Sequence, residues 1–184
     1  MSAGLVVVVV AAVLLLFVVT LYNRLVRLRN GVENAFSSVD VQLKQRCDLI
    51  PKVVEAMRDY MSHERGTLDE LTALRERAGA ASTGTDDRLK IDQQMAGMLR
   101  GLMVRAEAYP ELKASDTVAM LQRSLNEVEA QIAAARRTFN AAVTAFNTAI
   151  EVVPANLLAG PFGFARRAVF EAAVDERAVP TTAR

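Results

Sequence analysis

Residues 25–61 read LVRLRNGVENAFSSVDVQLKQRCDLIPKVVEAMRDYM, and apolar residues recur in this stretch every three or four positions. The stripe consists of Leu25, Leu28, Val32, Phe36, Val39, Leu43, Cys47, Ile50, Val54, Met57 and Met61. This spacing is typical of one face of an α-helix, so the stretch predicts a long amphipathic helix. Pro51 lies inside the stripe without changing its phase, so we expect a kink there and a helix that continues to about Ala78.

The residues before this stripe are apolar on every side. No charged residue occurs between positions 3 and 22, and every side chain from Leu5 to Val19 is apolar. Twenty helical residues rise about 30 Å, which matches the hydrocarbon core of a bilayer. A cleaved signal peptide is the alternative, but no Lys or Arg precedes the apolar run and the following residues make a poor cleavage site. We therefore predict a transmembrane anchor over residues 1–22.

Three basic residues follow the anchor directly. They are Arg24, Arg27 and Arg29, whereas no charged side chain precedes the apolar run. By the positive-inside rule, this asymmetry predicts a cytoplasmic C-terminal domain on a single-pass protein of the cell (inner) membrane, with the lipid bilayer as one partner. A solvated basic helix face would give the same composition without setting the orientation.

A second helix is predicted after a loop. Residues 79–87, GAASTGTDD, combine glycines, small polar residues and two acids, which is typical of a loop. Asp86 or Asp87 is suited to cap a helix that continues, by its apolar spacing, to about Tyr109.

A third helix is expected from Ser115 or Asp116 to about Val153, because either residue is a good cap and a proline follows at position 154. The next residues, PANLLAGPFGF at 154–164, form a turn-rich apolar connector. A short amphipathic helix is expected around Ala168 to Val174, before a flexible tail.

The helices predict an all-α fold. No alternating pattern long enough for a strand follows the anchor, and helices with one apolar face joined by short connections bury those faces as an antiparallel up-and-down bundle. The predicted organisation is an anchor at 1–22, a helical bundle at 23–164, and a short helix with a flexible tail at 165–184.

The composition excludes several classes of site. One Cys and one His leave no material for a disulfide framework or a zinc cluster, and a net charge of +1 argues against nucleic-acid binding. His63 could face Asp59 one helical turn away, but a di-iron bundle would need two Glu-x-x-His motifs. Cys47 belongs to the apolar stripe and is expected to act as a small core residue. We predict no catalytic residue, metal or cofactor.

Polar residues along the helices are candidates for a structural or partner-binding role. Asn140 and Asn147 lie two turns apart, and each directly follows a phenylalanine of the third helix. The first helix carries Asn30, Asn34 and Asp40. Amides at the edge of a helical core usually fix the register through interhelical hydrogen bonds, which is the role we expect. A polar partner site or a small-ligand pocket is the alternative.

Several motifs in combination resemble the LemA family. They are YNRLVRLRNGVENAFSSVDVQLKQRCDLIPKVVEAMRDYMSHE from residue 22, YPELKAS at 109–115, ARRTFNAAVTAFNTAIEVVPANLLAG at 135–160 and FGF at 162–164. The resemblance covers nearly all of the chain after residue 20. It implies a bacterial membrane protein with one N-terminal span, an up-and-down helical bundle, no established catalytic activity, and a link to membrane protein quality control or stress.

Together, these features favour a non-enzymatic protein whose bundle acts as a scaffold for protein interaction or self-assembly, with a protein partner or a second copy as its ligand. The alternative is a membrane-tethered ligand sensor or a metal-dependent enzyme. It would use a polar pocket between helices with acids such as Glu33, Asp40 and Glu129.

Overall fold

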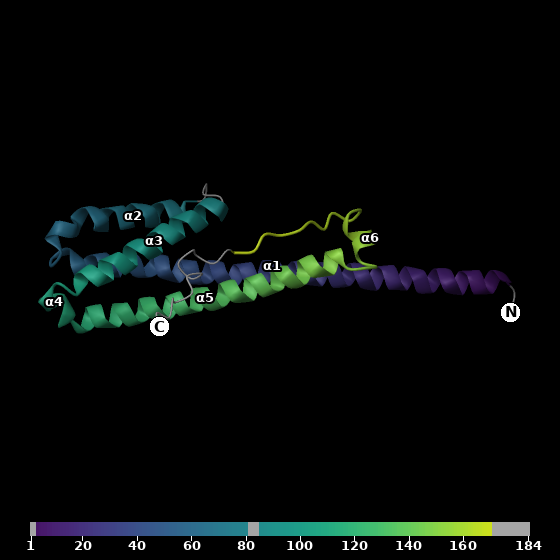
Figure 1. The fold of residues 1–184 in the computed structure, drawn as a ribbon, viewed down its shortest axis with the longest axis horizontal. Coiled ribbons are helices and arrows are strands. Elements are labelled where there is room, and N and C mark those ends of the chain that lie inside the picture. Colours follow the sequence, from purple (N-terminus) through teal and green to yellow (C-terminus); the bar gives the residue numbers. More distant parts are fainter. Residues whose placement is uncertain (1–2, 81–84, 171–184) are drawn as a thin grey trace, which may run out of the picture. The chain divides into compact units, whose positions relative to one another are not determined.

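The computed structural model describes residues 3–80 and 85–170, without the side chains of 85–89, and this part of the chain is helical and has no strand (Figure 1). Its elements are α1 (Ala3–Arg58), the short 3-10 helix η1 (Ser62–Glu64), α2 (Arg65–Gly79), α3 (Thr85–Ala106), α4 (Pro110–Lys113), α5 (Asp116–Glu151) and α6 (Asn156–Ala159). The prediction of an all-α fold is confirmed.

Helix α1 contains both the apolar run and most of the amphipathic stripe. Its first part includes a window of 18 residues that is apolar enough to cross a membrane and is 0% buried, the one such helix in the described part of the chain. From Leu25 onward, the predicted stripe faces inward, and Val39 and Ile50 are fully buried. Pro51 lies inside the helix, so the proline does not separate two helices.

The first helix ends earlier than the stripe predicted. It stops at Arg58 instead of about Ala78, and the amides of Tyr60 and Met61 close a turn on the carbonyl of Met57 at 3.2 and 2.9 Å. The chain then returns as α2, so Asp59 and His63 are not one turn apart on a helix as expected. The apolar phase alone could not reveal this turn, because two antiparallel helices each bury a stripe.

The second and third predicted helices are present as α3 and α5. Ser115 caps α5, since its hydroxyl accepts a hydrogen bond from the amide of Val118 at 3.4 Å. Helix α3 begins at Thr85, and the predicted caps Asp86 and Asp87 fall among the residues whose side chains are not described.

The chain divides into two compact units. The bundle unit, residues 40–133, contains the end of α1, then η1, α2, α3 and α4, and the start of α5. Apolar residues from all of its longer helices form one core cluster, which includes Met57, Leu71 and Met95. Helices α2 and α3 run side by side in opposite directions (Figure 1).

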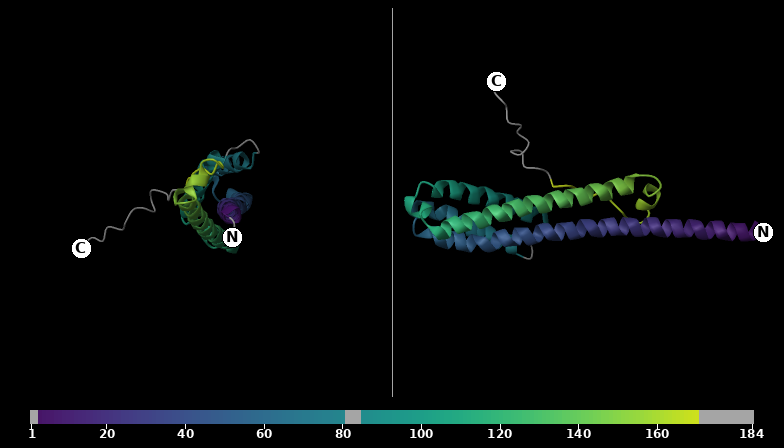
Figure 2. Two further views of the ribbon diagram at one scale, coloured as in Figure 1. Left: turned by 90° about the vertical axis from the view of Figure 1, so that its right-hand side faces the viewer. Right: turned by 90° about the horizontal axis from the view of Figure 1, so that it is seen from below.

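The anchor unit, residues 1–39 and 134–184, contains the rest of α1 and α5, together with α6. After α6 the chain turns back along α5 as residues 164–170, hereafter the return segment (Figure 1 and Figure 2). The return segment contains no helix. Of the short helix expected around 168–174, residues 168–170 are therefore non-helical, and residues 171–174 lie outside the described part of the chain.

Candidate functional site

Two asparagines of α5 hold the backbone of the return segment. The side-chain oxygen of Asn147 accepts a hydrogen bond from the amide of Arg167 at 2.9 Å, and its nitrogen donates to the carbonyl of the same residue at 2.8 Å. Asn140 makes the same pair of bonds with Phe170, at 2.8 and 2.9 Å. Each side-chain amide therefore binds one residue of the segment as a neighbouring β-strand would. We call Asn140 and Asn147 the asparagine pair.

The spacing of the asparagine pair fits an extended chain. Seven residues of helix advance about 10.5 Å, because each residue rises about 1.5 Å. Three residues of extended chain advance about 10 Å. Since Asn147 binds Arg167 and Asn140 binds Phe170, the return segment is extended and runs antiparallel to α5. Only an extended backbone brings the two residues to both amides.

The return segment depends on these side chains for its order. The amide of Phe164 still bonds to the carbonyl of Ala159, at 2.9 Å. Beyond it, residues 165–170 form no backbone-to-backbone hydrogen bond with any other residue in the described part of the chain. The side chains of residues 165–169 are exposed. The segment is thus bound to the helices in the manner of a peptide ligand.

Aromatic contacts fix the first residue of the segment. Phe164 is 6% exposed, and its ring centroid lies 5.8 Å from that of Tyr22 and 6.4 Å from that of Phe146. The guanidinium of Arg29 lies over the same ring at 5.5 Å. Phe164 therefore occupies an aromatic socket between α1 and α5.

A second set of aromatic contacts fixes the last described residue. The ring of Phe170 lies 4.8 Å from that of Phe139, which packs 5.8 Å from that of Phe36 on α1. The guanidinium of Arg136 lies over Phe170 at 5.7 Å. The two Phe-Asn pairs of α5 thus act together, because each phenylalanine packs on an aromatic ring of the segment while the asparagine beside it binds main chain.

One ion pair joins the segment to α1. The guanidinium of Arg167 contacts the Glu33 carboxylate at 2.9 Å, and both side chains are about half exposed, at 51% and 56%. Exposed ion pairs contribute about 0–1 kcal/mol, so this contact adds little to the stability of the fold. It does favour a positively charged side chain at position 167.

The other predicted residues lie apart from these contacts or touch them only once. Arg24 and Arg27 are exposed at the end of the apolar run, whereas Arg29, also exposed, packs on Phe164. Asn30 and Asn34 are exposed on α1. The interhelical hydrogen bonds expected of Asn140 and Asn147 are instead bonds to the return segment, whose extended form no periodicity indicated.

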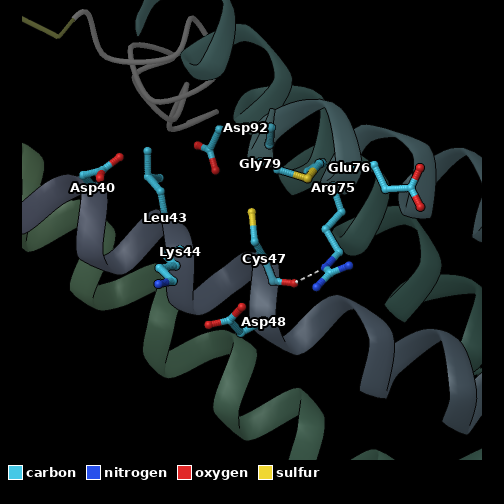
Figure 3. A pocket seen from close by; sticks show the side chains of 11 residues that line it. Asp40, Leu43, Lys44, Cys47, Asp48, Arg75, Glu76, Gly79 and Asp92 are labelled. Carbon is cyan, nitrogen blue, oxygen red and sulfur yellow. Dashed lines mark hydrogen bonds between the residues drawn. The ribbon is translucent and has the colours of Figure 1, made fainter. Parts of the chain in front are cut away.

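The bundle unit has a pocket of its own, with a volume of about 580 Å³ (Figure 3). Its lining includes Asp40, Lys44, Cys47, Asp48, Arg75, Glu76 and Asp92. The side chain of Arg75 donates to the backbone carbonyl of Cys47 at 3.2 Å. Burial, reinforced by the Asp92 carboxylate, raises the pKa of the Cys47 thiol. A protonated thiol is a weak nucleophile, so this position is poorly suited to covalent catalysis.

A buried arginine was not identified from the sequence. Arg46 is 1% exposed and forms ion pairs with Asp92 and, at 2.6 Å, with Glu129. Two acids considered for a metal site are therefore engaged with arginines, Glu129 with Arg46 and Glu33 with Arg167. No group of three or more metal-ligating side chains gathers in the described residues.

Comparison with known proteins gives relatives over most of the chain. The model of the LemA family matches residues 35–183. Protein LemA of Metamycoplasma hominis is 26% identical over 155 residues, which cover 84% of this chain and 71% of that protein.

Magnetosome proteins also match. Magnetosome protein MamQ of Magnetospirillum gryphiswaldense is 26% identical over 181 residues, which cover 83% of this chain and 66% of the relative. Magnetosome protein MamQ 2 of Paramagnetospirillum magneticum is 26% identical over 183 residues, which cover 84% and 67%. The family match spans well over half of the sequence and includes the asparagine pair and the return segment, and the chain belongs to the LemA family.

Proposed function

We propose that this protein is a non-enzymatic, single-pass protein of the cell (inner) membrane, whose helical domain lies in the cytoplasm and acts as a scaffold for protein interaction or self-assembly. The observation that carries the proposal is the continuity of α1. One helix contains an unburied apolar run and, from Leu25, a buried stripe. A helix of this kind couples a membrane anchor directly to a folded domain.

The charges beside the apolar run support the orientation. Arg24, Arg27 and Arg29 are all exposed where the run ends. Arginines at this depth are attracted to anionic headgroups by about 1 kcal/mol each and are retained on the cytoplasmic side. The link to membrane protein quality control or stress is part of the same proposal, since a scaffold at the membrane surface suits that role.

The contacts of the return segment support a binding role rather than a chemical one. The asparagine pair recognises peptide groups, and the ionisable side chains Arg46 and Glu129 are used in a mutual ion pair. Recognition of polypeptide main chain is what a protein scaffold requires.

Two measurements test the proposal. A reporter fused after Arg184 should be active only in its cytoplasmic form, and replacement of Arg24, Arg27 and Arg29 by Ser should weaken that preference. The full chain in lipid nanodiscs should also show a mass above that of one copy or should retain a protein partner on isolation. A periplasmic reporter signal, or a strict monomer that retains no partner, would contradict the proposal.

A further inference from the structure

We propose that the face of α1 and α5 that holds the return segment is a binding site for extended polypeptide, and that it accepts the return segment of a second copy of this chain. We call it the segment site, and it comprises the asparagine pair with Tyr22, Glu33, Phe139 and Phe146. This inference rests on the proposed function, because it names the element through which the scaffold would assemble.

The asparagine pair of the segment site recognises the main chain of the bound segment. All four hydrogen bonds of the asparagine pair go to backbone amides and carbonyls, which every polypeptide carries. Selectivity therefore comes from the side chains at three positions. Phe164 and Phe170 meet aromatic rings of α1 and α5, and Arg167 meets Glu33. The ligand chemistry is an extended Phe-x-x-Arg-x-x-Phe sequence.

The contacts indicate that the bound segment is exchangeable. Residues 165–170 make no backbone-to-backbone hydrogen bond within the described residues, and the side chains of 165–169 are exposed. Release of residues 165–170 therefore breaks contacts with the segment site and no backbone pairing, whereas release of Phe164 also breaks the bond of its amide to the carbonyl of Ala159. The same contacts would form again when the identical segment of another copy arrives.

The second copy is the occupant that the site specifies most completely. Its return segment carries both phenylalanines and the arginine at the required spacing, and exchange of an identical element is a low-cost route to a dimer. Anchoring in one membrane also raises the effective concentration of one copy near another. Exchange in the membrane requires that residues 152–163, which connect α5 to the segment and include α6, span to the neighbour.

Cysteine crosslinking between two full-length copies tests the exchange. Both copies carry Cys47→Ala, one carries Glu33→Cys with one tag, and the other carries Arg167→Cys with a second tag. The two positions are half exposed and in contact in the native chain, so a short bismaleimide reagent should join them wherever a segment occupies a site. After co-expression and treatment of membranes, we expect a crosslinked species that carries both tags.

Matched variants show whether the crosslink reports the segment site. Asn140→Ala with Asn147→Ala should lower the yield about tenfold or more, because four hydrogen bonds are lost. Asn126→Ala, at an exposed position of the same helix, should leave it unchanged. If the double variant proves unstable, a peptide of residues 162–170 provides a second test. Added in excess to the copies with intact asparagines, it should lower the yield of the crosslinked species. The same peptide with both Phe164 and Phe170 replaced by Ser should not.

A single chain that carries both Glu33→Cys and Arg167→Cys shows whether the segment stays on its own copy. Crosslinking within that chain, without any species that carries both tags, would show that the segment stays on its own copy and would overturn the exchange. A two-tag species that is insensitive to the asparagine variants, or no crosslink in either format, would also overturn it. The scaffold proposal would be judged separately, by the reporter and by the mass of the intact assembly.

Discussion

Asn147 binds Arg167 through both the amide and the carbonyl of that residue, at 2.9 and 2.8 Å. This relationship places a side chain where a neighbouring β-strand would be, in a part of the protein built from helices. Because Asn140 repeats it with Phe170, an extended segment is held in register along α5. The Phe-Asn pairs of α5 therefore have a physical role that neither residue would have alone.

Loss of the Asn147 side chain should expose the return segment to trypsin. The enzyme cleaves after Arg166 and Arg167, and a bound backbone must first leave its site. Replacement of Asn147 by Ala removes two hydrogen bonds, worth about 1 kcal/mol each, and should raise the cleavage rate about tenfold or more. Asn126→Ala is the matched control. Equal cleavage of both variants would contradict the role of Asn147.

Phe164 should contribute more to stability than its neighbour Phe162. Phe164 is 6% exposed among aromatic rings, whereas Phe162 is 51% exposed. Truncation of a buried Phe to Ala costs about 3–5 kcal/mol, so Phe164→Ala should lower the melting temperature clearly. Phe162→Ala should have a smaller effect, since its contact with Tyr22 is partly solvated. Similar melting temperatures for the two variants would argue against the aromatic socket.

Arg46 should be essential to the bundle unit. Its side chain is 1% exposed and bridges Asp92 and Glu129, so Arg46→Ala would leave the buried Asp92 carboxylate without this partner. Breaking a buried pair costs about 3–5 kcal/mol. The exposed pair of Arg58 with Asp69, at 3.9 Å, provides the control, and Arg58→Ala should cost less than about 1 kcal/mol. Denaturant unfolding distinguishes the two, and equal losses would refute the assignment.

The thiol of Cys47 should react slowly at neutral pH. Burial and the Asp92 carboxylate raise its pKa. The thiolate, which is the form that attacks an alkylating reagent, therefore forms at a higher pH than in a free cysteine. The alkylation rate against pH should show a midpoint above that of a free cysteine. Folding stability should fall as the pH rises from the pKa of the unfolded thiol to the higher pKa of the folded one, and Cys47→Ala should remove this slope. A midpoint below that of free cysteine would contradict the expected environment.

The periodic parts of the fold were predictable from the sequence, and the contacts between distant segments were not. The stripe from Leu25 predicted the buried face of α1, and Ser115 was one of the two residues, with Asp116, predicted to cap α5. The turn after Arg58 was missed, because the apolar spacing keeps its phase on both sides of it.

The candidate site was only partly predictable. Asn140 and Asn147 stood out by their spacing, but their partner did not, because residues 165–170 have a helix-like composition and take an extended form through tertiary contacts. Arg46 was missed because it is not part of the apolar stripe. It directly precedes Cys47, a stripe residue, and the sequence alone gives no sign that its side chain is buried. Periodicity in the sequence cannot identify the partner of a side chain that bonds to a distant part of the chain.

Amide hydrogen exchange along the return segment tests the central claim most directly. Measured by NMR on the full chain in nanodiscs, the amides of Arg167 and Phe170 should exchange slowly, because each donates to an asparagine oxygen. The amides of Ala168 and Val169, which lie between them, should exchange fast. Asn147→Ala should remove the protection of the Arg167 amide without removing that of Phe170, or before it does. Uniform protection from 165 to 170, as a helix would give, or none at any of these residues, would contradict an extended segment held by two asparagines.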